Sequence, residues 1–289
     1  MPTLPFCMSR RASMVRRDMR IFYINLLSRP DRRAAMEAQL GRLGLAAWRI
    51  EATTPAALLA TQTTEYCDPR KLRWLTEVEL ACSLSHIEAL RAIAVGADRF
   101  GLIFEDDVVL SSRLPRFLAD FDAARPTVDV LRLEADPDPM RVDPAEPVRV
   151  GDVALHRVHS WSNGAAGYIV SQHAARRIIE TGAMLRVQTD RVLFNPYEFI
   201  AYEKLVMLHT DPALCIQADR LEQDQRGVAL SDIGKARSRR QEIERALFPR
   251  RLLHDLHEAF DRDIRIGLQK AWHQYVGGAR QQVIPFAPD

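Results

Sequence analysis

The sequence predicts an α/β fold, in which a mostly parallel sheet lies between helices and a helical extension follows at the C-terminus. Short apolar runs rich in β-branched and aromatic residues alternate with amphipathic stretches over residues 20–225. From about residue 231 the character changes to long, charged, helical segments. A chain of 289 residues can bury one large core. We therefore expect a disordered basic leader over 1–19, a main domain over 20–225, and a helical extension over 226–289 that packs on it.

The first unit of the main domain reads as strand, tight turn, helix and strand. Residues 20–26 (RIFYINL) have the composition of a buried strand. In the helix that follows, Ser28 is the expected cap, Pro30 suits the first turn, and Gly41 or Gly44 ends the helix. The run AAWRIEA is the expected second strand.

The middle of the chain adds two further helix–strand pairs. Residues 53–74 are irregular, and we predict a loop there. Thr76 and Glu79 form a capping box, TEVE, that opens a helix. Its inward residues are expected to be Leu80, Leu84, Ile87, Leu90 and Ala94. The runs GLIFEDD and VDVLRLE are then strands, with the amphipathic helix SSRLPRFLADFDAA between them.

The last part of the main domain contains a hairpin, a strand and a helix. VGDVALHRVHSW reads as the hairpin, with Gly151 and Asp152 in its turn. GAAGYIV leads into a helix that Ser171 caps and that ends before Gly182.

Composition limits the classes of partner. The net charge of +2 is too small to indicate nucleic acid as a partner. Cysteines 7, 67, 82 and 215 form no C-x-x-C pair, which favours free thiols in a reducing compartment. No stretch approaches the roughly 20 apolar residues that span a bilayer, and the N-terminal arginines precede no apolar core. We expect a cytoplasmic protein, whose first residues are a leader, a misplaced start or a membrane-touching tail.

Three successive carboxylates, Glu105, Asp106 and Asp107, end the apolar run GLIFEDD. In open α/β sheets, ligands bind beyond the carboxyl ends of the strands. Because side chains alternate along a strand, Glu105 and Asp107 should face one way and Asp106 the other. Two oxygen donors on one side suit Mg²⁺ or Mn²⁺ together with substrate phosphates. The alternative is three solvated acids compensated by nearby arginines.

The loop after the first strand supports a phosphate site. INLLSRPDRR places Asn25 at the strand end and Arg29, Arg32 and Arg33 around the start of the next helix. A helix N-terminus with guanidinium groups beside it can bind phosphate. Exposed arginines in a first turn can equally be solvated.

Five blocks, taken in order, resemble glycosyltransferase family 25, which includes bacterial lipooligosaccharide galactosyl- and glucosyltransferases and relatives that galactosylate collagen. The blocks are INLLSRPDRR, LTEVELACSLSHIEAL, LIFEDDV, GAAGYIVS and DRVL, covering about residues 20–217. The resemblance implies a GT-A-like fold, a UDP-sugar donor, and inverting transfer of a hexose to a saccharide acceptor that can be lipid-linked. Val78 stands where family members often have Gly, which affects only the local turn geometry.

The resemblance also implies roles for single residues. Glu105 and Asp107 would hold the cation that stabilises the departing diphosphate, and Asp106 would accept hydrogen bonds from ribose. Asn25 and Arg32 would lie near the nucleotide, and Arg29 is a nucleotide-binding candidate from its place at the same helix start.

Further candidates lie outside the acidic block. The resemblance implies that Asp190 is the general base, because it stands in the block where family members carry an acid near the acceptor, and its alternative role is a helix cap. His209 could add a metal or phosphate contact, or be structural. Gly164 would allow close backbone approach to the donor. Glu79, Cys82 and His86 share one helix face, so His86 either faces the donor or forms a buried polar contact under the acidic loop.

The C-terminal segment leaves two interpretations open. Leu252, Leu253, Leu256 and Phe260 would form an apolar face among arginines 236, 238, 239, 245, 250 and 251. That face either packs on the main domain or docks on the anionic inner membrane. For the whole chain, the alternatives to a transferase are an inactive relative that binds nucleotide-sugar and a metal-dependent phosphohydrolase.

Overall fold

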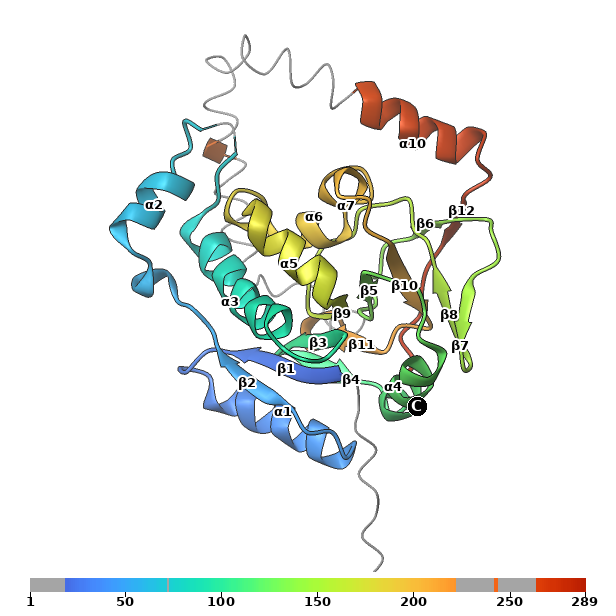
Figure 1. Ribbon diagram of the computed structural model, residues 1–289, viewed down its shortest axis with the longest axis horizontal. Helices are drawn as coiled ribbons and strands as arrows, with labels where there is room; N and C mark the ends of the chain where they lie inside the picture. Colours follow the sequence, from blue (N-terminus) through green and yellow to red (C-terminus); the bar gives the residue numbers. More distant parts are fainter. Residues whose placement is uncertain (1–18, 72, 222–241, 244–263) are drawn as a thin grey trace, which may run out of the picture.

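The protein is described by a computed structural model that covers residues 19–71, 73–221, 242–243 and 264–289 (Figure 1). Within these residues an eight-stranded sheet has the order β2-β1-β3-β9-β5-β10-β8-β7. Its strands are β1 (Met19–Asn25), β2 (Trp48–Glu51), β3 (Phe100–Glu105), β5 (Val130–Arg132), β7 (Val148–Val150), β8 (Val153–His156), β9 (Gly167–Ser171) and β10 (Met207–Asp211). Two short pairs lie outside it, β4 (Val108–Leu110) with β11 (Cys215–Gln217) and β6 (Met140–Val142) with β12 (Arg280–Gln282).

Most strands of the central sheet point the same way. β1, β2, β3, β5, β7 and β10 share one direction, and β8 and β9 run against them. The mostly parallel sheet expected from the sequence is therefore confirmed. One feature was not expected: β9 lies antiparallel between β3 and β5, so its N-terminal end meets their carboxyl ends.

Helices cover both faces of the sheet (Figure 1). On one face lie α3 (Glu77–Ala94), α5 (Gln172–Thr181) and α6 (Thr189–Phe194), and on the other α1 (Pro30–Arg42) and α4 (Leu114–Ala124). Alternation along β1 builds both cores: Phe22 and Ile24 pack with α3 and α5, while Ile21 and Tyr23 pack with α1 and α4. The other helices named among the described residues are η1 (Pro55–Ala57), α2 (Ala60–Tyr66), η2 (Ala183–Leu185), α7 (Phe199–Tyr202) and α10 (Arg265–Tyr275).

The sequence signals for helix ends are confirmed in most places. Thr76 and Glu79 form the expected reciprocal capping box of α3. Ser171 caps α5 by accepting a hydrogen bond from the Ala174 N–H, and Gly182 ends that helix with φ 61°. The hairpin turn is also confirmed, with Gly151 at φ 58° between β7 and β8.

Two local predictions were wrong. Ser28 does not cap α1, because Arg29 occupies the N-cap position without a side-chain bond and Pro30 starts the helix. Residues 53–74 are not a plain loop, since they contain η1 and α2. The helix α2 has no buried residue, so no apolar stripe marks it in the sequence.

The end of the chain returns to the main domain. β12 pairs with β6, and Phe286 forms a β-bridge with Ala213. Ile284 is buried beside them. The predicted leader, apart from Met19 in β1, lies outside the described residues. So do the apolar and basic residues between 236 and 260 on which the predicted docking face depends.

Candidate functional site at the carboxyl edge of the sheet

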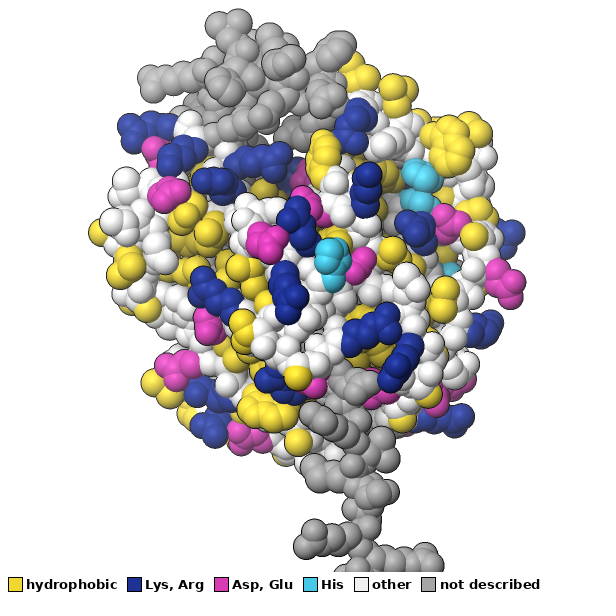
Figure 2. All heavy atoms as spheres, viewed as in Figure 1, with side chains coloured by type: hydrophobic (Ala, Val, Ile, Leu, Met, Phe, Trp, Pro, Cys, Tyr) yellow, Lys and Arg dark blue, Asp and Glu magenta, His cyan; other side chains and the backbone are white. Residues whose placement is uncertain are grey.

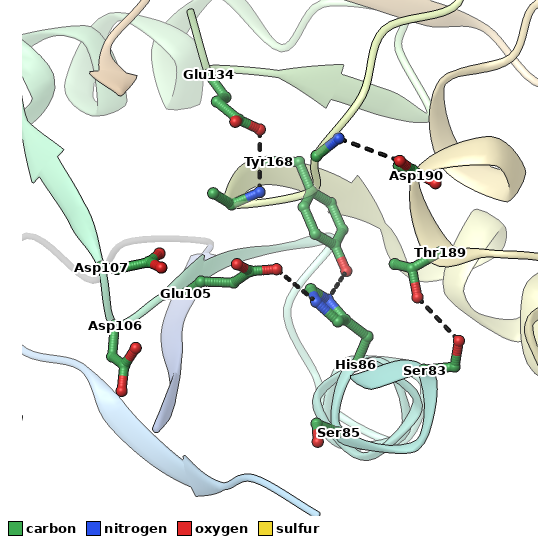
Figure 3. A network of polar contacts seen from close by, with 12 residues as sticks. Ser83, Ser85, His86, Glu105, Asp106, Asp107, Glu134, Tyr168, Thr189 and Asp190 are labelled. Carbon is green, nitrogen blue, oxygen red and sulfur yellow. Dashed lines mark hydrogen bonds and ion pairs between the residues drawn. The ribbon is translucent and has the colours of Figure 1, made fainter. Parts of the chain in front are cut away.

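The sheet topology gathers the candidate residues at one edge. β1, β3 and β5 end there, and antiparallel β9 begins there, so Glu105 is paired with Ile24 and Phe104 with Gly167. The acidic turn after β3, Asn25 at the end of β1, and the loop before β9 therefore lie next to one another. Figure 3 shows the acids and the residues around them.

Asp106 is held by two side chains from the first unit of the fold. Asn25 Nδ2 donates a 2.6 Å hydrogen bond to Asp106 Oδ2. Arg32 Nη1 donates to Asp106 Oδ1 at 3.2 Å. Both carboxylate oxygens of Asp106 therefore have protein partners, and the acid turns away from Glu105 and Asp107 as the alternation predicts (Figure 3).

Asp107 is compensated on one oxygen only. Its Oδ2 accepts from Arg32 Nη1 at 3.1 Å, whereas its Oδ1 is buried without a hydrogen-bond partner among the described residues. Burial and, next, the charge of Glu105 raise the pKa of Asp107 to about 7, although Arg32 opposes the shift. Among the described residues, no hydrogen-bond donor therefore compensates the Oδ1 atom of Asp107.

Glu105 leans toward α3. Its Oε1 lies 3.3 Å from His86 Nε2, and His86 Nδ1 lies 3.0 Å from the hydroxyl of Tyr168 on β9 (Figure 3). His86 is 1% exposed and Tyr168 is fully buried. Of the two roles left open for His86, the structure favours the buried polar contact beneath the acidic turn.

Asp190 faces the loop before β9. Its Oδ2 accepts a 3.2 Å hydrogen bond from the backbone N–H of Gly164, and its Oδ1 accepts from the N–H of Arg191 at 2.8 Å. Gln188, not Asp190, is the N-cap of α6, so the capping alternative is wrong. Gly164 has φ +90°, a conformation that favours glycine.

A buried ion pair that the sequence reading missed lies under the same loop. Glu134 Oε2 accepts from the Ala166 N–H at 3.0 Å and lies 3.2 Å from Arg132 Nη2. Burial raises the pKa of Glu134, and Arg132 and Arg220 oppose that rise. A Cβ at Gly164 would lie 2.9 Å from Glu134 Oε1. The sequence does contain a signal for Glu134, because the apolar run VLRLEAD also ends in acidic residues.

Two predicted site residues do not join this group. The Arg29 side chain pairs with its neighbour Asp31 on the surface, although its backbone oxygen accepts from Asn25 Nδ2. His209 lies fully buried on β10, which β9 and β5 separate from β3, and its Nδ1 contacts the Thr210 carbonyl. Burial and then Arg132 lower the pKa of His209 to about 3.

A cavity of about 450 Å³ lies elsewhere, along α2 and the segment after it. Its lining residues are Ala60, Thr61, Thr64, Glu65 and Lys71. None of the predicted site residues is among them.

Comparison with known proteins decides the family. The sequence profile of glycosyltransferase family 25 (LPS biosynthesis protein) matches residues 19–193, more than half of the chain. The chain belongs to glycosyltransferase family 25. The matched span starts at β1 and ends in α6, so it contains all of the candidate residues except His209. The expected enzyme class, a glycosyltransferase, and the expected type, lipooligosaccharide biosynthesis, are confirmed at this level.

Several curated proteins are similar to this family 25 chain. The lacto-N-neotetraose biosynthesis glycosyltransferase LgtE of Neisseria meningitidis serogroup B is 29% identical over 206 residues, 67% of this chain and 72% of that protein. The lipooligosaccharide biosynthesis protein lex-1 of Haemophilus influenzae is 27% identical, over 60% of each chain. Procollagen galactosyltransferase 1-A of Xenopus laevis is 29% identical over 58% of this chain, which spans only 29% of that protein.

The family also contains a relative described as inactive. The "Inactive glycosyltransferase 25 family member 3" of Homo sapiens is 27% identical over 62% of this chain and 31% of that protein. Among solved structures, a glycosyltransferase involved in the glycosylation of the major capsid of PBCV-1 aligns with a TM-score of 0.40 and 10% identity, covering 78% of this chain and 98% of that chain.

Proposed function

We propose that this family 25 glycosyltransferase moves a hexose, galactose or glucose, from a UDP-sugar to a saccharide acceptor of lipooligosaccharide or another cell-surface glycan. The transfer is a single displacement that inverts the anomeric carbon, and it uses Mn²⁺ or Mg²⁺. The observation that carries the proposal is the state of Asp107. Its Oδ1 is buried with no hydrogen-bond partner among the described residues, and burial beside Glu105 raises its pKa, which supports a carboxylate that a cation would compensate.

The donor set fits a hard divalent cation. Glu105 and Asp107 supply carboxylate oxygens on one side of the acidic turn, as Mg²⁺ and Mn²⁺ prefer. A bound cation would offset the negative charge that develops on the leaving diphosphate. His209 lies too deep in the core to take part, so the proposed site uses the two acids without it.

The surrounding side chains suit the nucleotide. Arg32 lies 31% exposed at the start of α1 and contacts both Asp106 and Asp107. Its guanidinium can turn from these acids to a phosphate when a cation neutralises Asp107. Asn25 orients Asp106, whose carboxylate is then placed to accept hydrogen bonds from ribose hydroxyls. Arg29 stands exposed at the same helix start, where it can meet the diphosphate from solvent.

Asp190 is the proposed general base. Two backbone N–H groups, of Gly164 and Arg191, fix its carboxylate at the edge of the site. A carboxylate that accepts the acceptor hydroxyl proton during attack contributes about 10²–10⁴-fold to the rate. Gly164 contributes through its backbone, since a side chain there would displace Glu134 and the loop that orients Asp190.

The acceptor is proposed to be presented at the inner membrane surface, as a lipid-linked saccharide. No helix in the described parts of the chain is both long and apolar enough to cross a bilayer. The helix α10 and its C-cap residue carry four exposed apolar side chains, where Figure 2 shows apolar atoms gathered at the upper right. These residues are Leu268, Trp272, Tyr275 and Val276. Peripheral contact through α10 is consistent with that surface.

The test is release of UDP from UDP-galactose and from UDP-glucose, measured with a saccharide acceptor and with Mn²⁺ or a chelator. We expect turnover that requires the acceptor, stops with the chelator and returns with Mn²⁺. Turnover that continues at the same rate with the chelator would refute the proposed requirement for a divalent cation. Nucleotide binding without turnover on any competent acceptor would identify an inactive relative, and UDP-sugar or phosphoester hydrolysis without acceptor would favour the phosphohydrolase.

A further inference from the structure

A second arrangement of metal-binding atoms lies directly behind the acidic turn. The thiol of Cys82, the imidazole of His86 and the carboxylate of Glu105 each present one ligand atom, and the three atoms lie within 4.8 Å of one another. Cys82 and His86 are one turn apart on α3, so they share the helix face that meets the end of β3. Glu105 completes the group from the strand.

The types of ligand suit a tetrahedral, thiophilic ion better than the hard cation of the proposed transfer reaction. Two ligands about 2.0–2.1 Å from a tetrahedral metal lie about 3.3–3.4 Å apart. His86 Nε2 and Glu105 Oε1 are 3.3 Å apart. A thiolate and an imidazole are ligands that Zn²⁺ and similar thiophilic ions prefer over Mg²⁺.

The second contact of His86 supports this assignment. Metal-ligating histidines almost always donate the other ring N–H to an oxygen acceptor, which fixes the tautomer and the ring orientation. His86 Nδ1 lies 3.0 Å from the Tyr168 hydroxyl, and the two rings stack with centroids 5.9 Å apart. Nε2 is therefore presented toward Glu105 with the ring already oriented.

We propose that Cys82, His86 and Glu105 form a binding site for Zn²⁺ or another thiophilic divalent cation. Three protein ligands leave a fourth position for water, which distinguishes this site from a closed structural one. When the ion binds, the Cys82 thiol releases its proton to solvent and a metal–sulfur bond forms. Glu105 belongs to both this site and the proposed Mn²⁺ or Mg²⁺ site, so a thiophilic ion would withdraw Glu105 from transfer and inhibit the enzyme.

Binding is tested on the full, chelator-treated chain with Co²⁺ as the probe, because a Co²⁺–thiolate bond gives a near-ultraviolet charge-transfer band. We expect the band in the wild type, and its loss when one equivalent of Zn²⁺ is added. C82S should lose the band and bind Zn²⁺ about tenfold or more weakly, and H86N should weaken binding similarly. C67S is the matched control, because Cys67 is also a partly buried thiol but lies outside the cluster.

Three results would overturn the proposal: no band in the wild type, a band that survives in C82S, or Zn²⁺ affinity that C82S and H86N leave unchanged. Thermal melting of each metal-free variant shows whether it is folded. Inhibition is a separate measurement that rests on the proposed function. Zn²⁺ should inhibit Mn²⁺-dependent transfer in the wild type and C67S, and should inhibit C82S less when each variant is compared with its own zinc-free rate. Because the Co²⁺ spectrum needs no turnover, failure of the proposed function leaves the metal site testable.

Discussion

Asn25 and Asp106 are joined by a 2.6 Å hydrogen bond that ties the end of β1 to the acidic turn after β3. With Arg32 on its other oxygen, Asp106 has one partner on each carboxylate oxygen. Asp107, the next residue, has one buried oxygen with no hydrogen-bond partner among the described residues. Two adjacent aspartates thus have different roles open to them. Asp106 is positioned by the protein, and Asp107 is the aspartate that we propose as a ligand of the cation.

The first prediction concerns Asp107. D107N should lower acceptor-dependent turnover about 100-fold or more, because loss of the carboxylate removes a charged oxygen that faces the cation. Binding of Mn²⁺–UDP, measured by calorimetry, should weaken in parallel. D152N is the control, because Asp152 is an exposed acid in the β7–β8 turn that pairs with Arg113. Full turnover in D107N would contradict the assignment.

The second prediction separates a base from a scaffold at Asp190. D190N keeps an oxygen that can accept one backbone N–H but cannot take a proton from the acceptor hydroxyl. We expect kcat to fall about 10²–10⁴-fold while donor binding and the melting temperature stay close to those of the wild type. If D190N instead loses donor binding and unfolds more easily, Asp190 serves only to anchor the loop at Gly164.

The third prediction concerns Gly164. G164A introduces a Cβ 2.9 Å from Glu134 Oε1 at a residue with φ +90°. Strain of this kind costs about 1–3 kcal/mol, so the free energy of unfolding in urea should fall by that amount. Turnover should fall as well, because the loop orients Asp190. G41A is the matched control: no atom lies within 4 Å of its new Cβ, and the change should stabilise α1. If G164A is as stable as the wild type, the loop before β9 accommodates the added Cβ without strain.

The fourth prediction follows from His209. Burial lowers its pKa to about 3 in the folded protein, whereas the unfolded chain has the ordinary value of 6.5. The unfolded state therefore binds the proton first, and stability is lost as the pH falls from about 6.5 toward 3. The slope is at most about 1.4 kcal/mol per pH unit for one group.

The measurement is urea unfolding of wild type and H209Q between pH 7 and pH 4. H209Q should show a flatter decline of stability with acidification, even if it is less stable at pH 7. H173Q is the matched histidine replacement, since His173 is an exposed histidine on α5. An unchanged slope in H209Q would mean that His209 is not buried in its neutral form.

Most helices and strands could be predicted from the sequence, because the signals that define them lie within a few residues of one another. The capping box at Thr76 and Glu79, the cap at Ser171 and the glycine at 182 depend on neighbours within a few residues, so they could be predicted. The apolar stripe of α3 could be predicted for the same reason, because it depends on residues three or four positions apart. The helix α2 was missed because it buries no residue and so leaves no apolar period. The direction of β9 was missed because strand direction depends on partners far away in the chain.

The sequence by itself determined that acids end an apolar strand, that Asn25 and Arg32 follow another, and that the chain belongs among family 25 transferases. Only the tertiary structure decided how those groups are paired. It placed Arg32 on Asp106 and Asp107 and put His86 beneath Glu105. Within the described part of the chain it left one buried Asp107 oxygen without a hydrogen-bond partner. It also kept His209 in the core, far along the sheet from β3. The reason is that residue type sets what a side chain can bind, whereas burial and distance between remote segments set what it does bind.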